Sequence, residues 1–214
     1  MTAGKIILLN GSSSAGKTTL ARALQQKLDE PWQHIALDQF RNGMSGRYRG
    51  LNSPAGTPGH AGLNIVPAEM AFTDAAETHT EKVTHIRFGE IGRKMLKGMR
   101  RAIAAFAEAG NNVIVDDILF EPEFLEDYVD ALGHLNVLLV AVRCPLSIVN
   151  QRERKRSGRF PGTATSHFHR IHENITYDIE VDTSLDSPLQ CASQVIRHLR
   201  EVHSFDAVKR MKRD

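Results

Sequence analysis

The residues Gly11 to Thr18, Gly-Ser-Ser-Ser-Ala-Gly-Lys-Thr, have the spacing of a loop that binds the phosphates of a nucleotide. Gly11 and Gly16 allow the backbone to turn so that successive N–H groups point at phosphate oxygens. Lys17 places a cation beside the β and γ phosphates, and the Thr18 hydroxyl can ligate a bridging Mg²⁺ ion. A glycine-rich turn before a lysine is the alternative, but a chance match is on the order of 1% for such a chain. The predicted nucleotide-binding residues are Gly11, Ser12, Ser13, Ser14, Ala15, Gly16, Lys17, Thr18 and Thr19.

Two carboxylates, Asp116 and Asp117, follow the apolar run Val113 to Val115. A carboxylate that ends a buried strand beside a phosphate loop can hold the Mg²⁺ ion through water. We assign that role to Asp116 and expect Asp117 to face the substrate. Either residue could instead cap a helix or form a turn.

A third carboxylate, Asp38, ends the run Ile35-Ala-Leu-Asp. A carboxylate at this place could accept or orient the proton of an attacking hydroxyl group, as phosphoryl transfer to an alcohol requires. From spacing alone, a helix-capping or turn role is equally compatible. Asp38 is therefore a candidate catalytic and substrate-binding residue.

A basic segment, Arg143 to Arg170, contains seven Lys or Arg residues and one acidic residue. A helix that ends in a basic, glycine-containing turn suits a lid that closes over phosphates, because arginine offers several donors to the transferring group. We predict a lid at residues 152–165, with Arg152 and Arg156 catalytic and Arg159 nucleotide-binding. A solvated helix face and a nucleic-acid patch are the alternatives.

Three histidines in the same segment, His167, His169 and His172, invite comparison with a metal site. A helix places only residues three or four apart on one face, so His167 would not share a face with the other two. Ordinary surface histidines, or histidines beside the nucleotide, are the favoured interpretation.

Residues 41–67 contain six Gly, three Pro and no acidic residue. Segments of this kind within a domain are usually lids, binding loops or linkers. Because the segment follows the second predicted strand, we expect it at the edge where open α/β sheets bind ligands. Arg41, Arg47 and Arg49 are therefore candidate substrate-binding residues, with an inert insertion as the alternative.

These residues require a scaffold in which strands and helices alternate. Apolar runs predict strands at Lys5–Leu9, His34–Asp38, Asn112–Asp116, Val137–Val142 and Asp178–Asp182. Helical periodicity predicts helices at Lys17–Leu28, Gly89–Ala109, Pro122–Leu132, Pro145–Lys155, Thr165–Asn174 and Pro188–Val202. Several strands are nearly continuous Val, Ile and Leu, which is typical of parallel strands covered on both faces. The sequence therefore predicts a three-layer α/β fold, with a central parallel sheet of about five strands, in one domain over residues 1–214.

Length and composition narrow the classes of protein. The chain has 214 residues, 41% of them hydrophobic, and 27 Lys+Arg against 25 Asp+Glu give a net charge of +2. Its apolar runs are too short to cross a bilayer and its N-terminus shows no signal-peptide pattern, so we expect no membrane contact. Two cysteines make neither a disulfide framework nor a metal-ligand spacing, which favours a reducing cytoplasm. The balanced charge argues against an electrostatic nucleic-acid binder.

Together these residues resemble the chloramphenicol phosphotransferase family of P-loop kinases. The resemblance lies in Ile6–Thr18, Glu30-Pro-Trp, Val113–Asp117, Val142-Arg-Cys, the Arg152/Arg156/Arg159 spacing and Tyr177–Thr183. It implies a fold similar to that of nucleoside and shikimate kinases, with a mobile lid. It also implies transfer of the γ-phosphate of ATP to an alcohol of a small molecule, which in the namesake enzyme is the antibiotic.

The resemblance extends to single positions. Lys17 and Thr18 match the phosphate-loop pair, and Asp38 matches the acidic residue proposed as the base of the family. The three lid arginines match basic positions of the lid. Thr183 follows the last strand, where related kinases hold the adenine, which implies a nucleotide-binding role for it.

Residues 41–67 depart from the family pattern, so the resemblance leaves the acceptor open. The three arginines of this segment suggest an acceptor that is anionic or rich in hydrogen-bond acceptors. A nucleoside, nucleotide or sugar kinase of the same fold is a second interpretation. An ATP-binding regulator or nucleic-acid-binding module is a third, and the sequence does not predict an oligomeric state.

Overall fold

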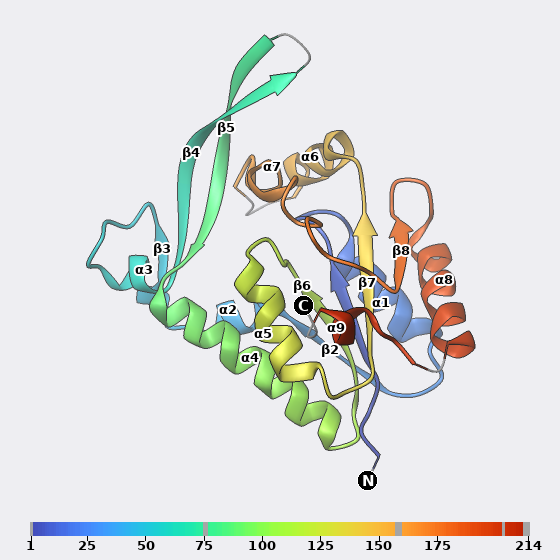
Figure 1. Cartoon of the computed structure of the whole chain (residues 1–214). Coiled ribbons are helices and arrows are strands. Elements are labelled where there is room, and N and C mark those ends of the chain that lie inside the picture. The colour runs from blue at the N-terminus through green and yellow to red at the C-terminus, as the bar shows by residue number, and fades with distance from the viewer. Residues whose placement is uncertain (1, 75–76, 157–159, 203, 212–214) are drawn as a thin grey trace.

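The computed structural model describes residues 2–74, 77–156, 160–202 and 204–211. At its centre, five parallel strands form one sheet in the order β2-β6-β1-β7-β8 (Figure 1). Their bounds are β1 Ile6–Asn10, β2 Trp32–Ala36, β6 Asn112–Asp117, β7 Val137–Arg143 and β8 Ile179–Asp182. The predicted three-layer α/β fold around a parallel sheet is confirmed.

Helices cover both faces of this sheet (Figure 1). Its inner strands therefore carry apolar side chains on both sides, because neither side meets water. One face carries α1 Lys17–Lys27, α6 Leu146–Arg154 and α8 Pro188–Glu201, and the other carries α4 Glu90–Glu108, α5 Pro122–Leu132 and α9 Ala207–Arg210. Alternate side chains of β1 enter the two cores, Ile7 and Leu9 on the α1 side and Ile6 and Leu8 on the α4 side. Among the described residues, no helix combines the length and the apolar character needed to cross a membrane.

The second strand lies two residues earlier than predicted. The predicted strand His34–Asp38 is wrong in position, because Asp38 lies in the first turn of helix α2, Leu37–Gly43. The cause is local: the Gln39 side chain accepts a 2.9 Å hydrogen bond from the Ala36 N–H and so satisfies a donor at the start of the helix. Asp38 still follows the carboxyl end of a sheet strand, as its predicted role requires.

The helix predicted at Thr165–Asn174 is wrong in extent. The structure forms only α7, Thr163–His167, and the chain then runs through turns. The Ile171 carbonyl, which a longer helix would use internally, instead accepts a 2.7 Å hydrogen bond from the Asn10 side chain at the end of β1. A contact between segments distant in sequence therefore replaces the local helical bond.

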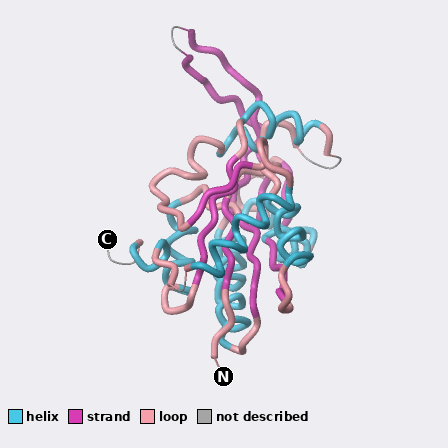
Figure 2. Tube along the Cα trace, turned by 90° about the vertical axis from the view of Figure 1, so that its right-hand side faces the viewer, coloured by secondary structure: helices cyan, strands magenta, loops and turns pink. Residues whose placement is uncertain are grey.

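A second sheet, absent from the sequence prediction, stands beside the first and projects away from it (Figures 1 and 2). Its strands are β3 Arg49–Leu51, β4 Leu63–Asp74 and β5 Glu77–Phe88, and β4 pairs antiparallel with β5 along its whole length. The glycine- and proline-rich segment 41–67 thus contains regular structure, with a 3₁₀ helix at Gly46–Tyr48, β3, α3 Pro58–Ala61 and the start of β4.

Pro67 obscures this hairpin at the level of sequence, because proline is disfavoured inside a sheet. In the structure β3 pairs only with Leu63 to Ile65, so at Pro67 the sole described neighbour of β4 is β5. An edge position tolerates a residue that has no N–H group to donate.

The segment predicted as a lid packs against this hairpin. The Thr84 N–H of β5 donates to the Gly162 carbonyl at 3.2 Å, and the Thr84 hydroxyl donates to the Pro161 carbonyl at 2.8 Å. On the opposite side, the buried Glu153 carboxylate of α6 accepts hydrogen bonds from the Gly162 and Ala164 N–H groups, at 2.8 and 3.0 Å. Helix α6 and the hairpin therefore hold the segment that leads into α7 between them.

Candidate active site

The phosphate loop leaves β1 and turns into the N-terminus of α1. A side chain at position 11 would place its Cβ only 2.5 Å from the Val142 carbonyl oxygen, so Gly11 has no room for one. Gly16 has a φ of 99°, in the left-handed region, where it caps α1. Both glycines of the motif therefore meet a physical requirement of the turn.

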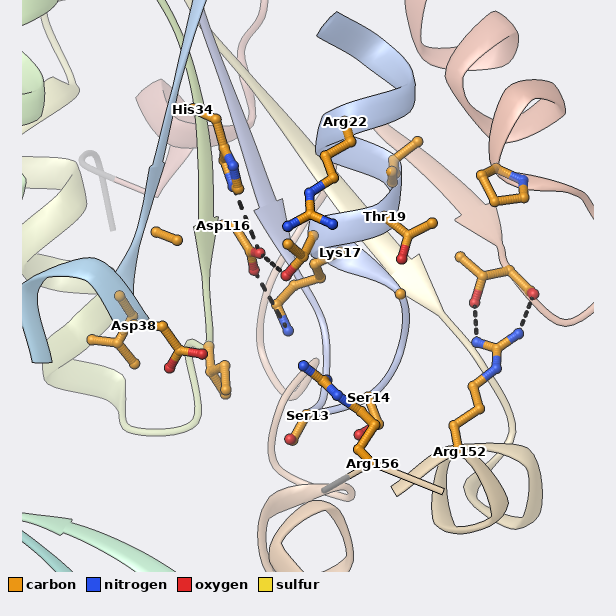
Figure 3. Close-up of a pocket in the computed structure, with 18 of the residues that line it drawn as sticks. Ser13, Ser14, Lys17, Thr19, Arg22, His34, Asp38, Asp116, Arg152 and Arg156 are labelled. Carbon is orange, nitrogen blue, oxygen red and sulfur yellow. Dashed lines mark hydrogen bonds and ion pairs between the residues drawn. The ribbon is translucent and has the colours of Figure 1, made fainter. Parts of the chain in front are cut away.

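Lys17, the first residue of α1, faces Asp116 of β6 (Figure 3), and Thr18 contacts the same carboxylate. Lys17 Nζ donates to the carbonyl oxygens of Gly11 and Ser12 at 2.8 and 2.9 Å, and lies 3.9 Å from Asp116 Oδ1. The Thr18 hydroxyl donates to Asp116 Oδ2 at 2.5 Å. The structure thus brings together the three side chains that the sequence assigned to phosphate and metal.

His34 of β2 is a fourth member of this group that the sequence prediction missed. Its Nε2 lies 3.8 Å from Asp116 Oδ2, since in the parallel register His34 and Asp116 project from the same face of the sheet. Burial raises the pKa of Asp116, but His34, Lys17 and Thr18 together outweigh burial and hold that pKa below its usual value. A carboxylate kept ionised in a buried place is suited to holding a cation.

A cavity of about 820 Å³ opens in front of the phosphate loop. The predicted site residues that line it are Ser13, Ser14, Gly16, Lys17, Thr18, Thr19, Asp38, Asp116, Arg152, Arg156 and Thr183. Asp38 lies across the cavity from Lys17 (Figure 3), and its carboxylate is 3.1 Å from Arg41 in an ion pair. Arg41 therefore contacts the candidate base directly.

Arg22 and Lys155 also line this cavity without having been predicted. Arg22 follows Thr18 by one turn of α1, and its side chain points toward Lys17 and Asp116 (Figure 3). The spacing of four residues on a helix was the only sequence signal for it, because such residues share a face.

Arg152 contacts protein groups rather than projecting freely into the cavity. Its guanidinium donates to the Thr183 hydroxyl at 3.0 Å and to the Thr183 carbonyl at 2.7 Å, and the same hydroxyl donates to the Ala15 carbonyl at 2.6 Å. Arg152 and Thr183 thus connect α6, the end of β8 and the phosphate loop. Arg156 lies beside Ser13 and Ser14 (Figure 3), whereas Arg159 lies outside the described residues.

Asp117, predicted to face the substrate, points to the opposite face of the sheet and does not line the cavity. It is buried, where it accepts hydrogen bonds from the Tyr128 hydroxyl at 2.9 Å and from the Ile118 N–H at 2.7 Å. Arg100 lies 3.8 Å away, yet burial dominates and raises the pKa of Asp117. The structure gives this residue a place in the core beneath α4 and α5.

The remaining predicted substrate residues, Arg47 and Arg49, also lie outside the cavity lining. Both are exposed near the base of the second sheet, and the Arg47 guanidinium lies over the Tyr48 ring, 4.9 Å from its centre. Of the three arginines proposed for the acceptor, only Arg41 contacts a residue that lines the cavity, namely Asp38.

His167 at the end of α7 contacts the phosphate loop itself. Its Nε2 accepts a 3.1 Å hydrogen bond from the Ser13 N–H, and its ring stacks on Phe120 with centroids 5.4 Å apart. Burial lowers the pKa of His167 to about 3, helped by the nearby charges of Lys17, Arg170 and His85. The sequence favoured an ordinary or nucleotide-adjacent histidine here, and no local pattern distinguishes it from His169 or His172.

The chain matches the sequence profile described as "Chloramphenicol phosphotransferase-like protein" over residues 4–200. The chain belongs to this family. A candidate O-phosphotransferase of Mycobacterium tuberculosis (strain ATCC 25618 / H37Rv) is 31% identical over 203 residues, which cover 95% of this chain and 82% of that protein. The predicted family is confirmed, and with it the enzyme class: the protein is a kinase.

Solved structures agree with this fold. The APS kinase CysC of Mycobacterium tuberculosis, in complex with AMPPNP and APS, has a TM-score of 0.62 at 16% identity, covering 94% of this chain and 99% of that chain. Shikimate kinase from Acinetobacter baumannii has a TM-score of 0.52 at 10% identity, covering 94% of both chains. At such identities the likeness concerns the fold, which this member of the chloramphenicol phosphotransferase-like family shares with these two kinases.

Proposed function

We propose that this protein transfers the γ-phosphate of ATP to a hydroxyl group of a small molecule, with Mg²⁺ as cofactor. The chain would act as one kinase domain in the cytoplasm. One observation carries the proposal. The hydrogen bond from Thr18 to Asp116 and the Lys17 ammonium lie on one side of the cavity, and the Asp38 carboxylate lies on the other.

The phosphate side of the cavity would bind the nucleotide. Backbone N–H groups of the phosphate loop and the Lys17 ammonium would hold the β and γ phosphates. The Lys17 ammonium would exchange its present bonds to the Gly11 and Ser12 carbonyls for bonds to phosphate oxygens. Thr183, tied to Ala15 and to Arg152, would border the adenine.

The residues present fit a magnesium ion. A hydroxyl and an ionised carboxylate, on Thr18 and Asp116, are hard oxygen donors, and Mg²⁺ takes its other ligands from phosphates and water. Held by Thr18 and Asp116, such an ion would supply positive charge to offset the negative charge that develops during transfer. The Thr18 hydroxyl would then give up its hydrogen bond to Asp116 and ligate the metal ion through its oxygen.

The acceptor side would place a hydroxyl group next to Asp38. This carboxylate would accept or orient the hydroxyl proton as the oxygen attacks the γ-phosphate. Arg41, in its ion pair with Asp38, would hold the carboxylate in place. Arg156, beside the phosphate loop, would stabilise charge on the transferring group.

The experiment that tests this function measures ADP release and identifies the product by mass spectrometry. The full chain is incubated with ATP, Mg²⁺ and a panel of chloramphenicol, nucleosides, sugars and hydroxy acids. The proposal requires ADP release that depends on one acceptor, together with a product heavier by one phosphoryl group. Lys17→Met should abolish both signals. Acceptor-independent ADP release, or nucleotide binding coupled to salt-dependent nucleic-acid binding, would favour a regulator or nucleic-acid module instead.

A further inference from the structure

A group of basic side chains lies on the hairpin side of the phosphate loop, outside the residues that line the main cavity. It consists of His85 and Arg87 of β5 together with Arg170, which follows α7. We call these three residues the basic rim. None of them was singled out as a site residue by the sequence.

The register of the hairpin places His85 and Arg87 on one face of the second sheet. Residues two apart on a strand share a face, and residues directly opposite on the partner strand share it as well. His79 lies on this face because it is six residues before His85 on the same strand, and its partner Phe72 on β4 lies there too. The Phe72 ring centre is 6.4 Å from that of His169. This ring contact shows that the face that carries the rim turns toward the chain that follows α7, the segment that contains Arg170.

His167 connects this rim to the phosphate loop. Its ring is buried and receives the Ser13 N–H at 3.1 Å. Burial is the largest cause of the lowered pKa of His167. The next causes are the charges of Lys17, Arg170 and His85, so all three groups act on one ring. The rim thus lies on the side of the phosphate loop that contacts His167.

In the part of the chain that the structure describes, no carboxylate forms an ion pair with the rim residues. Burial is the largest cause of the lowered pKa of His85, and the positive charges of Arg87 and Arg170 are the next causes. Arg87 and Arg170 are both exposed, and among the described residues neither forms an ion pair. By contrast, Arg93 pairs with Glu121 and Arg143 pairs with Glu180. The rim therefore concentrates cations that an anion can satisfy.

We propose that the basic rim binds a carboxylate or phosphate group of the acceptor, so that the acceptor of this kinase is an alcohol that also carries an oxyanion. The inference rests on the function proposed above and specifies its substrate class. The two guanidinium groups offer forked donors that match the oxygens of such a group. The acceptor hydroxyl lies toward Asp38 and its anionic end toward the rim. The preference for an anion thus comes from Arg87 and Arg170, not from Arg47 and Arg49.

The first test uses acceptor pairs that share hydroxyl groups and differ in charge. Glycerate and glycerol 3-phosphate are compared with glycerol, and gluconate with glucose, by ADP release from ATP and Mg²⁺. The anionic member should have a kcat/KM at least about tenfold above that of its neutral partner. Comparing the carboxylate with the phosphate arm shows which oxyanion is preferred. Equal or better transfer to the neutral members overturns the inference while leaving the kinase function intact.

Variants locate the effect. Arg87→Gln and Arg170→Gln should each raise the KM for the anionic acceptor about tenfold and leave the KM for ATP unchanged. Lys82→Gln is the matched control, because Lys82 is exposed on the opposite face of the same strand. Equal effects of all three substitutions, or none from the two rim variants, contradict a binding role for the rim.

A binding measurement decides the case even when no member of the panel is phosphorylated. With AMPPNP saturating the nucleotide site, inorganic phosphate should raise the Tm of the wild type and of Lys82→Gln by a few degrees. It should not raise the Tm of the Arg87→Gln/Arg170→Gln double variant. A shift that persists in the double variant, or that is absent from the wild type, overturns the rim as an oxyanion site. The absence of all transfer, with this shift intact, counts against the kinase proposal alone.

Discussion

The Ser13 N–H of the phosphate loop donates a 3.1 Å hydrogen bond to Nε2 of His167, at the end of α7. A backbone donor that belongs to the phosphate-binding turn is thereby held by a side chain at the end of α7, just beyond the segment predicted as a lid. His167 also stacks on Phe120, which follows β6. The position of α7 and the shape of the phosphate loop are therefore coupled through one imidazole ring.

This coupling predicts different outcomes for two substitutions of His167. His167→Phe keeps a ring that can stack on Phe120 but removes the acceptor, and it leaves the Ser13 N–H unsatisfied. We expect kcat/KM for ATP to fall by roughly tenfold or more. His167→Gln restores an acceptor oxygen and should recover most of the activity. Steady-state kinetics check this, and equal activities for the two variants would show that the hydrogen bond has no role.

The same residue predicts a pH dependence of stability. The pKa of His167 is lowered from 6.5 to about 3 in the folded protein by burial. Between pH 6.5 and pH 3, His167 binds a proton in the unfolded chain but not in the folded protein. The free energy of unfolding therefore decreases as the pH drops below 6.5, and above that pH His167 causes no such loss. From pH 7 to pH 5 the loss due to His167 is about 2 kcal/mol.

Urea unfolding at both pH values measures this loss. His167→Gln should show a smaller decrease in the free energy of unfolding between pH 7 and pH 5, by about 2 kcal/mol. His60→Gln, on an exposed residue, should behave as the wild type. A wild-type pH dependence in His167→Gln contradicts a neutral, buried imidazole at this position.

Asp38 is predicted to act in catalysis rather than in nucleotide binding. Its side chain is 44% exposed, so Asp38→Asn should fold normally. Loss of a general base predicts a fall in kcat by about 100-fold or more, with the Kd of ATP nearly unchanged. Asp130→Asn, an exposed carboxylate on α5, is the control. Near-normal turnover of Asp38→Asn with the true acceptor would remove Asp38 from the mechanism.

Arg152 is predicted to position the nucleotide through Thr183 rather than to touch the transferring phosphate. A lysine keeps the charge but cannot make both hydrogen bonds to Thr183, at 3.0 and 2.7 Å. Arg152→Lys should therefore raise the KM for ATP about tenfold with a smaller effect on kcat. Arg154→Lys, an exposed position on the same helix, should change neither value. A fall in kcat at unchanged KM would instead support the direct catalytic role suggested by the sequence.

The sequence by itself determined the phosphate loop, the parallel sheet and the family. The reason is that these features rest on local rules: glycine spacing sets the turn, and continuous Val, Ile and Leu mark strands covered on both faces. One cavity is lined by Lys17, Thr18, Asp116 and Asp38. Each of these residues lies at the carboxyl end of a strand of the parallel sheet or in the segment that follows that end.

Only the tertiary structure decided which neighbours these residues meet. Asp117 follows Asp116 directly, yet alternation along a strand sends it into the opposite core, against Tyr128. Arg152 was expected at the phosphates, but long-range packing places it on Thr183. The hairpin β4–β5 and its contact with the lid region depend on pairings that no local pattern specifies, and so does the hydrogen bond between Ser13 and His167, residues that lie 154 positions apart.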